Sequence, residues 1–315
     1  MARVGNFKKY KHTIMSSLQK NMLLKLLTIS LLFSTACSAK NQGEDFILTG
    51  STPGDDEIKN ILHIPATTLV DFIRWEVQLN NNNSFVLNVQ YGESQPNTLG
   101  FKKDGERKTL KGSFSISKSN RFNEIYHLKG VGLKDEISIV KLNNNIFHLL
   151  SSHEQLMIGN GGWSYSLNRK DAVKDNKMTI SSLKEEDNIL HRVYEGRTPC
   201  KEISSQHPEM NASPACFKIK WKLVLNRDSI TKQPTTCTIR NIVDNQPRDI
   251  VGKWEILKGT ANDPSVFIYK ITVSNLTDPI LFLAADNNIL LFLDKEKEPL
   301  VGNDDFSFTM NKVNK

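Results

Sequence analysis

An internal duplication constrains the fold of this chain more than any other feature of the sequence. Four blocks recur in the same order with nearly constant spacing, and short loops absorb the small differences in offset. The matching blocks are residues 73–80 with 219–226, 112–116 with 252–256, 144–150 with 287–293, and 159–169 with 302–312. Two copies with so long a period predict two separate domains, like beads on a string, and not a solenoid. We expect domains over residues 47–170 and 187–315, joined by a polar linker over 171–186.

Within each copy the hydrophobic residues recur with a period of two. Residues 217–225 alternate apolar side chains with Lys218, Lys220 and Lys222, and residues 85–91 alternate in the same way. This period is typical of strands with one buried face, and no stretch has a convincing helical period. Turn signals separate the strands, so we predict an all-β fold of two tandem small antiparallel β-barrels, each a lipocalin-like meander whose closure removes exposed edges. The expected hairpin turns lie at 80–83, 104–105, 143–145, 286–288 and 302–303, and the matched core aromatics are Trp75 with Trp221, Phe114 with Trp254, and Trp163 with Phe306.

The N-terminal segment has the organisation of a secretory signal peptide. Residues 1–36 contain six basic residues and no acidic one, with an apolar run over 26–33 and small residues after it. Residues 34–37 resemble the bacterial lipobox, in which the cysteine receives a lipid, although Ser34 replaces the usual leucine. We therefore predict a signal peptide over 1–36, lipidation of Cys37 and a polar tether over 37–46. Cleavage near Ala39, which would discard Cys37, is the alternative, and Met22 is a second candidate start.

Removal of the signal peptide changes the electrostatics of the chain. The full sequence has 41 basic and 34 acidic residues, so the loss of six basic residues lowers the net charge from +7 to +1. A nearly neutral chain lacks the basic surface of a nucleic-acid-binding protein. We interpret Lys218, Lys220 and Lys222 as a solvated strand face. Ser38 follows Cys37, and no aspartate is present there to favour retention in an inner membrane, so the expected location is the outer membrane of a bacterial envelope. The expected partners are this membrane, through the lipid anchor, and other envelope proteins.

The second copy resembles the N-terminal domain of the NlpE lipoproteins. The resemblance rests on residues 193–200, 219–225, 252–254 and 290–294, which follow that family's Gly-x-x-Pro-Cys segment, first long strand, Gly-x-Trp strand and late Leu-Asp strand end. It implies a lipocalin-like barrel on an outer-membrane lipoprotein with a role in copper tolerance or envelope stress. The family motif continues Pro-Cys-x-x-Cys, but Ile203 stands at the second cysteine position. In the first copy, residues 64–66 stand where we expect the motif.

Three cysteines follow Cys37, and all lie in the second copy. In an oxidising compartment, the first hypothesis is a Cys200–Cys216 disulfide that closes an inserted loop, with Cys237 buried on a strand. The second is a soft-metal site for copper, formed by Cys200, His207, Met210 and Cys216, because thiolate, thioether and imidazole ligands suit Cu(I). Spacing alone does not decide between them, and oxidation of the thiols would abolish the second.

The sequence gives little support for an enzyme. It has no His-Glu-x-x-His, no Gly-x-Ser-x-Gly and no phosphate-binding glycine loop. The loops 159–162 and 302–305 are interpreted as equivalent turns, with Asp304 and Asp305 as a polar loop tip in preference to a cation site. We predict a non-catalytic binding or sensing module of the envelope. The alternative is a structural, surface-tethered interaction module with no ligand site. A small apolar ligand inside a barrel is a further hypothesis, since eight-stranded barrels can hold one.

Overall fold

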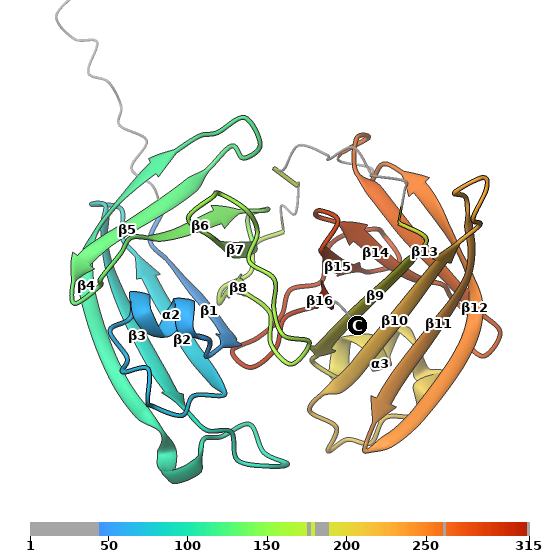
Figure 1. Cartoon of the computed structure of the whole chain (residues 1–315), viewed down its shortest axis with the longest axis horizontal. Coiled ribbons are helices and arrows are strands. Elements are labelled where there is room, and N and C mark those ends of the chain that lie inside the picture. The colour runs from blue at the N-terminus through green and yellow to red at the C-terminus, as the bar shows by residue number, and fades with distance from the viewer. Residues whose placement is uncertain (1–43, 175–177, 180–188, 261–262, 314–315) are drawn as a thin grey trace, which may run out of the picture. The chain divides into compact units, whose positions relative to one another are not determined.

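Each copy of the repeat folds into a closed, eight-stranded antiparallel barrel in the computed structural model (Figure 1). The structure describes residues 44–174, 178–179, 189–260 and 263–313. The predicted all-β fold with two tandem barrels is confirmed. The first barrel contains β1 (Phe46–Pro53), β2 (Phe72–Leu79), β3 (Ser84–Gly92), β4 (Glu106–Ser117), β5 (Ile125–Val131), β6 (Ile137–Lys141), β7 (Ile146–Leu150) and β8 (Ser166–Arg169); the second contains β9 (His191–Thr198), β10 (Ile219–Arg227), β11 (Pro234–Val243), β12 (Gln246–Lys258), β13 (Phe267–Val273), β14 (Ile280–Ala284), β15 (Ile289–Leu293) and β16 (Thr309–Lys312).

Both barrels follow the same meander topology. Each strand pairs with the next in the chain, and the last strand pairs with the first through β1–β8 and β9–β16. The alternation read from the sequence is visible in β10, where every second residue is buried. Most turn signals lie between paired strands as expected. Two predicted hairpin turns are exceptions. Residues 104–105 end a longer connection from β3 to β4 that includes η1 (Lys102–Asp104), and residues 302–303 lie within the long connection from β15 to β16.

Matched aromatic residues lie in the two cores at equivalent positions. Trp75 and Trp221 are buried, and their indole N–H groups donate to Thr52 Oγ1 at 2.8 Å and Thr198 Oγ1 at 2.9 Å. A buried indole that has this partner keeps its apolar contacts without an unsatisfied donor. The prediction that these aromatics belong to the core is therefore confirmed for this pair. It is wrong for Trp163, which is half-buried and belongs to neither barrel core.

The same two threonines correct the expected position of the motif in the first copy. Residues 50–53 read Gly-Ser-Thr-Pro and residues 196–199 read Gly-Arg-Thr-Pro, and both end a strand that pairs with the tryptophan strand. The equivalent of Pro199 is therefore Pro53, and the expectation that residues 64–66 stand at the motif is wrong. Gly54 occupies the position of Cys200, so the first copy has the motif without its cysteine.

A short helix covers one opening of each barrel. The helix α2 (Asp56–Ile61) begins at Asp55, whose carboxylate accepts from the Ile58 N–H at 3.1 Å, and it buries Ile58 in the first core. The helix α3 (Lys201–Gln206) buries Ile203 in the second core. The sequence analysis missed both because six residues are too few to establish a helical period. No helix among the described residues has the length and apolar character needed to span a membrane.

The two barrels are packed against each other through a shared hydrophobic cluster. All residues of β7 and β15 are buried, because one face points into its own barrel and the other faces the neighbouring barrel. The shared cluster consists of Phe122, Ile125, Val140, Leu142, Ile146, Leu150, Leu156 and Met178 with Val266, Ile268, Leu281, Leu283, Ala285, Ile289, Leu291 and Leu293. The expectation of beads on a string is therefore wrong, since separating the barrels would expose this surface to water.

Hydrogen bonds at this interface join equivalent positions of the two copies. The hydroxyls of Ser164 and Ser307 lie 2.6 Å apart, and those of Ser166 and Thr309 lie 2.9 Å apart. Two further bonds are reciprocal: Gly159 N donates to Asn311 Oδ1 and Gly302 N donates to Asn168 Oδ1, both at 2.8 Å. Contacts of this kind define an isologous interface about an internal pseudo-twofold axis. The tandem therefore behaves like a homodimer whose subunits share one chain.

The described part of the predicted linker is attached to the first barrel. Val173 N donates to Asn145 Oδ1 at 2.7 Å, Thr179 N donates to Leu142 O at 2.8 Å, and Met178 is buried in the shared cluster. These contacts attach Val173 and Thr179 to the first barrel and place Met178 where the barrels meet.

Candidate functional site

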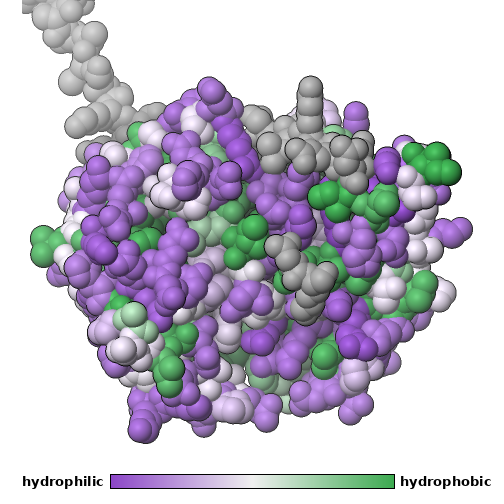
Figure 2. Space-filling view, in the orientation of Figure 1, coloured by the Kyte–Doolittle hydropathy of each residue, from purple (hydrophilic) through white to green (hydrophobic). Residues whose placement is uncertain are grey.

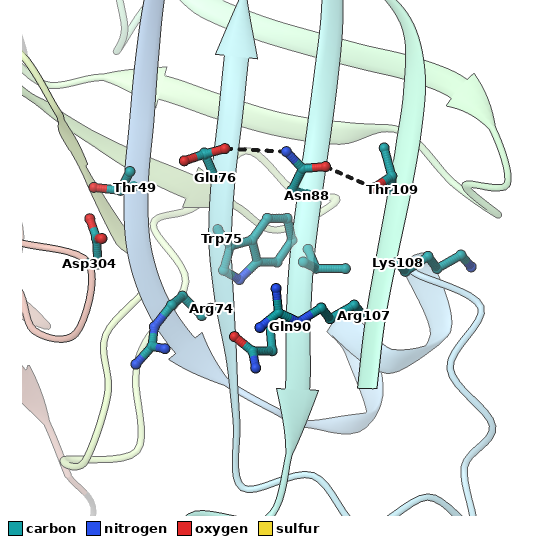
Figure 3. Close-up of a pocket in the computed structure, with 11 residues that line it drawn as sticks. Thr49, Arg74, Trp75, Glu76, Asn88, Gln90, Arg107, Lys108, Thr109 and Asp304 are labelled. Atoms are coloured by element: carbon teal, nitrogen blue, oxygen red, sulfur yellow. Dashed lines mark hydrogen bonds between the residues drawn. The ribbon is translucent and has the colours of Figure 1, made fainter. Parts of the chain in front are cut away.

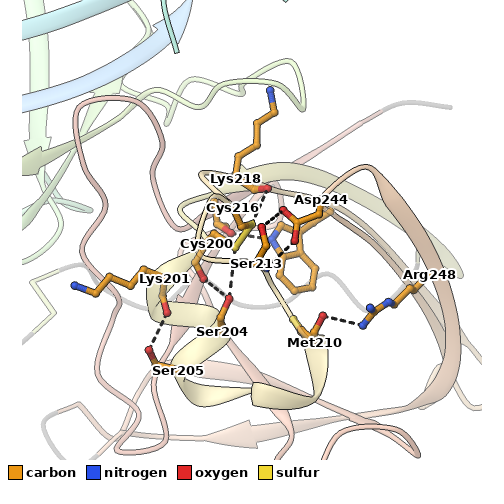
Figure 4. Close-up of a disulfide and its surroundings, with 12 residues drawn as sticks. Cys200, Lys201, Ser204, Ser205, Met210, Ser213, Cys216, Lys218, Asp244 and Arg248 are labelled. Atoms are coloured by element: carbon orange, nitrogen blue, oxygen red, sulfur yellow. Dashed lines mark hydrogen bonds between the residues drawn. A yellow bond between two sulfur atoms is a disulfide. The ribbon is translucent and has the colours of Figure 1, made fainter. Parts of the chain in front are cut away.

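The predicted disulfide is present and closes a loop beside one end of the second barrel (Figure 4). Cys200 and Cys216 are bonded across a separation of 16 residues. The loop is also attached elsewhere: Ser213 donates to Asp244 through its backbone N–H at 2.7 Å, and Arg248 donates to the Met210 carbonyl at 2.9 Å. The loop therefore acts as a fixed cover of the barrel. Cys37, the predicted lipidation site, lies outside the described residues, as do the predicted signal peptide and most of the predicted tether.

The predicted copper ligands do not form a site in this oxidised form. The disulfide uses the sulfurs of Cys200 and Cys216, and Met210 packs in the hydrophobic core. His207 is buried beside them, and this burial lowers its pKa. Among the described residues, no group of three or more His, Cys, Asp or Glu side chains is placed to hold a metal ion. Copper binding by the reduced loop stays a prediction.

Cys237 is buried on β11, as predicted. Burial raises the pKa of its thiol to about 11, although the backbone of Gly252 opposes the shift. Its thiol therefore stays protonated at neutral pH, and this disfavours both nucleophilic and metal-binding roles.

Packed side chains occupy the barrel interiors. One continuous buried cluster runs through each barrel and includes the residues of the covering helix. Binding of a small apolar ligand inside a barrel stays a prediction, but the described residues also form clefts on the outer faces. Figure 2 shows one face of the molecule as mainly hydrophilic, with hydrophobic residues in small separate patches. The clefts are therefore of more functional interest than an apolar surface.

One cleft, which we call the junction groove, lies where the two barrels meet. It has a volume of about 290 Å³. The β3–β4 connection and the loop before β8 supply its first-barrel side, and β9, β10 and the loop before β16 supply the other. It is lined by Phe72, residues 94–100, Trp163, Arg197, Lys218, Lys220, Asp305 and Phe306.

A stack of planar groups crosses the junction groove. The rings of Phe101 and Phe72 stack at 4.1 Å, and those of Phe72 and Trp163 stack at 4.9 Å. The guanidinium carbon of Arg197, from the second barrel, lies 4.8 Å from the centroid of the Trp163 ring. Cation–π contacts of this type fix the plane of the guanidinium. The first barrel therefore orients a cationic group that belongs to the second.

Two lysines lie beside Arg197 on the same outer face. Lys220 is paired with Arg197 across β9 and β10, and Lys218 lies two positions before Lys220. The ammonium of Lys218 extends away from the disulfide (Figure 4) and lies 4.9 Å from the centroid of the Phe217 ring. Burial lowers the pKa of Arg197, and burial followed by the charges of Arg197 and Lys220 lowers the pKa of Lys218. Within the described residues, none of these three cations forms an ion pair with a carboxylate.

The polar groups at the equivalent positions of the first copy have partners within the molecule. Arg74, which corresponds to Lys220, forms an ion pair with Asp305 of the second barrel. Ser51, which corresponds to Arg197, donates to the Asp304 carbonyl at 2.7 Å. Burial raises the pKa of Asp305, and the charge of Arg74 opposes this shift. At these positions the first copy therefore has one cation, which is paired with a carboxylate, whereas the second copy has three cations.

Three further polar residues on this first-copy face bond to one another (Figure 3). Asn88 lies between Glu76 and Thr109, donating to the Glu76 carboxylate at 3.2 Å and accepting from the Thr109 hydroxyl at 2.8 Å. The cleft over these strands has a volume of about 330 Å³ and is lined in part by these bonded groups.

Sequence reasoning missed the junction groove. Lys218 and Lys220 were interpreted as a solvated strand face, but both are half-buried and line the groove. One signal was present: the repeat places Gly161 and Gly162 opposite the second barrel where Asp304 and Asp305 stand opposite the first. The alternation of residues along a strand shows which side chains share a face, but it does not show that the other barrel contributes Trp163 to the groove.

Comparison with protein-family models, with curated proteins and with solved structures found no match.

Proposed function

We propose that this chain is a lipid-anchored envelope protein that acts as a non-catalytic binding module, with the junction groove as its binding site. The observation that carries the proposal is the set of three cations on the second barrel, which have no carboxylate partner among the described residues and lie beside an aromatic stack. Cationic groups held partly out of water are costly unless a ligand of opposite charge binds them. The sequence of residues 1–37 supports export and attachment, and the NlpE resemblance supports an outer-membrane location.

A rigid connection between the barrels supports binding at their junction. The shared cluster and the reciprocal hydrogen bonds fix the two sides of the groove relative to each other. A preorganised site loses less conformational entropy when a ligand binds. The cationic and aromatic groups of the groove suit the holding of a ligand, and this supports a binding role.

Photo-crosslinking in intact cells tests the binding site. Leu99 lies on the rim of the groove with 37% of its surface exposed, and Val131 is 92% exposed on the β5 strand. A photoreactive residue at position 99 should give a discrete adduct, and the same residue at position 131 should give none. A small-molecule adduct supports the proposal. Equal or absent labelling at the two positions contradicts it and favours the alternative, a structural interaction module with no ligand site.

Metabolic labelling tests the anchor separately. The wild-type chain should incorporate a fatty-acid analogue and sediment with membranes, and Cys37→Ser should abolish incorporation. Labelling that persists in Cys37→Ser, or a wild-type N-terminus after Ala39, would contradict lipidation at Cys37.

A further inference from the structure

We propose that the junction groove binds the phosphoryl group of an organic phosphate through Arg197, Lys218 and Lys220. This inference rests on the proposed binding function and names the ligand class for the same groove. Soluble phosphomonoesters and the headgroup of a phosphatidic acid share this chemistry.

The first step of the argument is the orientation of Arg197. Its guanidinium lies 4.8 Å from the centroid of Trp163, which itself stacks on Phe72 at 4.9 Å. A guanidinium held in one plane presents parallel N–H donors, which match two oxygens of a phosphate. Less side-chain freedom is then lost on binding than for an unrestrained arginine.

The second step is the balance of charge. Arg197, Lys218 and Lys220 share one face, and Glu195 lies two positions from Arg197 on the same face of β9. Asp305 also lines the groove, but its carboxylate is paired with Arg74. The local excess is therefore about two positive charges. A phosphate monoester carries about −1.5 to −2 at neutral pH, whereas a single carboxylate carries only −1, so the phosphate neutralises the cluster more completely.

The third step is the apolar part of the groove. Pro96, Leu99 and Phe306 contribute apolar surface to the lining of the groove. Inorganic phosphate would leave this surface in contact with water. A phosphate with an apolar body attached would cover it and gain from its burial. Organic phosphates should therefore bind more tightly than inorganic phosphate.

The duplication provides an internal control for the argument. Gly162 occupies the position that Asp305 holds in the other copy, and a Cβ on Gly162 would lie 3.4 Å from the guanidinium carbon of Arg197. An aspartate at position 162 would therefore place a carboxylate beside Arg197, as Asp305 lies beside Arg74. In the wild-type chain an external anion would take this place.

The test is titration calorimetry on the full chain in a non-ionic detergent, with phenyl phosphate as the probe. We expect binding of phenyl phosphate, weaker binding of inorganic phosphate and no binding of phenol. Arg197→Gln and Lys218→Gln should each weaken binding by roughly tenfold, and Gly162→Asp should abolish it. Lys111→Gln, which removes an exposed lysine from β4 of the first barrel, should change the affinity by less than about twofold.

Dihexanoyl phosphatidic acid, with dihexanoyl phosphatidylcholine as its control, distinguishes the two sources of the phosphate. Tighter binding of the phosphatidic acid than of phenyl phosphate assigns the groove to lipid headgroups, and the reverse order assigns it to soluble phosphomonoesters. Either order supports the shared chemistry. Arg197→Lys separates the effect of stacking from that of charge, because it keeps the positive charge and removes the planar guanidinium. We expect this variant to lose most of the affinity.

Two results would overturn the inference. One is a wild-type chain that binds none of the phosphates, and the other is a Gly162→Asp chain that folds normally, with a wild-type circular dichroism spectrum, and binds as tightly as the wild type. If a discrete small-molecule adduct still formed at position 99, the binding function would stand and only the ligand class would be wrong.

Discussion

The outer faces of the two barrels have the same backbone but opposite chemistry. In the first copy, the positions equivalent to Arg197 and Lys220 hold Ser51 and Arg74. The loop from the second barrel accepts a hydrogen bond from Ser51 at the Asp304 carbonyl and neutralises Arg74 with the Asp305 carboxylate. In the second copy, the loop from the first barrel brings the uncharged Gly162 to Arg197 and Gly161 to Glu195. Duplication thus supplied two equivalent sites. Changes on both sides of the junction made one a protein–protein contact and left the other with unmatched charge.

The largest expected effect concerns the covers of the two barrels. The second barrel's cover is closed by the Cys200–Cys216 disulfide, and α2 covers the first without one. The double variant Cys200→Ser/Cys216→Ser should lose about 3 kcal/mol of unfolding free energy, since the disulfide restricts the unfolded chain. Urea unfolding measures the loss. Hydrogen exchange should rise over residues 201–216 and stay unchanged over 56–64, and equal changes in both covers would contradict this assignment.

The next effect concerns His148, whose equivalent in the second copy is Leu291. His148 is completely buried at the barrel interface, where its Nε2–H donates to the Met157 carbonyl at 2.8 Å and its Nδ1 accepts from Ser166 at 3.0 Å. Burial lowers its pKa from 6.5 to about 4. The folded chain therefore binds fewer protons than the unfolded chain between these values, and stability falls as the pH falls through this window.

Because of this histidine, the free energy of unfolding should be about 2 kcal/mol lower at pH 5 than at pH 7.5. Denaturant titrations at a series of pH values measure the slope. His148→Leu, which copies the residue of the other barrel, should remove this part of the slope. A slope unchanged in His148→Leu would assign the pH dependence to other groups.

A smaller effect is expected from the reciprocal hydrogen bonds of the interface. Asn311→Ala leaves the buried Gly159 N–H without its acceptor and Asn168→Ala leaves the half-buried Gly302 N–H without its acceptor, so each should cost about 1 kcal/mol. Because the contacts are equivalent, the two losses should be similar when measured by thermal or urea unfolding. A loss confined to one of the two would show that the copies have diverged at the interface as well.

The smallest effect on stability is expected at the neutralised site. Asp305→Asn should lower the unfolding free energy by less than about 1 kcal/mol, since its partner Arg74 stays partly exposed. It should also release Arg74 to bind phenyl phosphate, roughly tenfold more weakly than the second copy does. Calorimetry on a Gly162→Asp background, in which the other site is blocked, measures this binding. No gain of binding would contradict the view that Asp305 takes the place of an anion.

Much of the fold follows from local patterns. The period of two, the repeat and the turn signals predict the barrels, and the spacing of Cys200 and Cys216 allowed the disulfide. One available signal was not used. Residues 289–293 form a continuous apolar run, which indicates a strand buried on both faces. Together with the similar run in β7, it could have predicted that the barrels share an interface.

The junction groove could not be predicted in this way, because its residues come from segments far apart in the sequence. Phe72, Trp163 and Lys218 belong to two barrels, and the plane of Arg197 depends on a ring supplied by the other copy. The sequence alone determined two equivalent barrels and the pairs of residues that occupy equivalent positions in them. Only the tertiary structure decided which outer faces meet and which cations are left unpaired, because alternation fixes the face of a strand on which a side chain lies but not what covers that face.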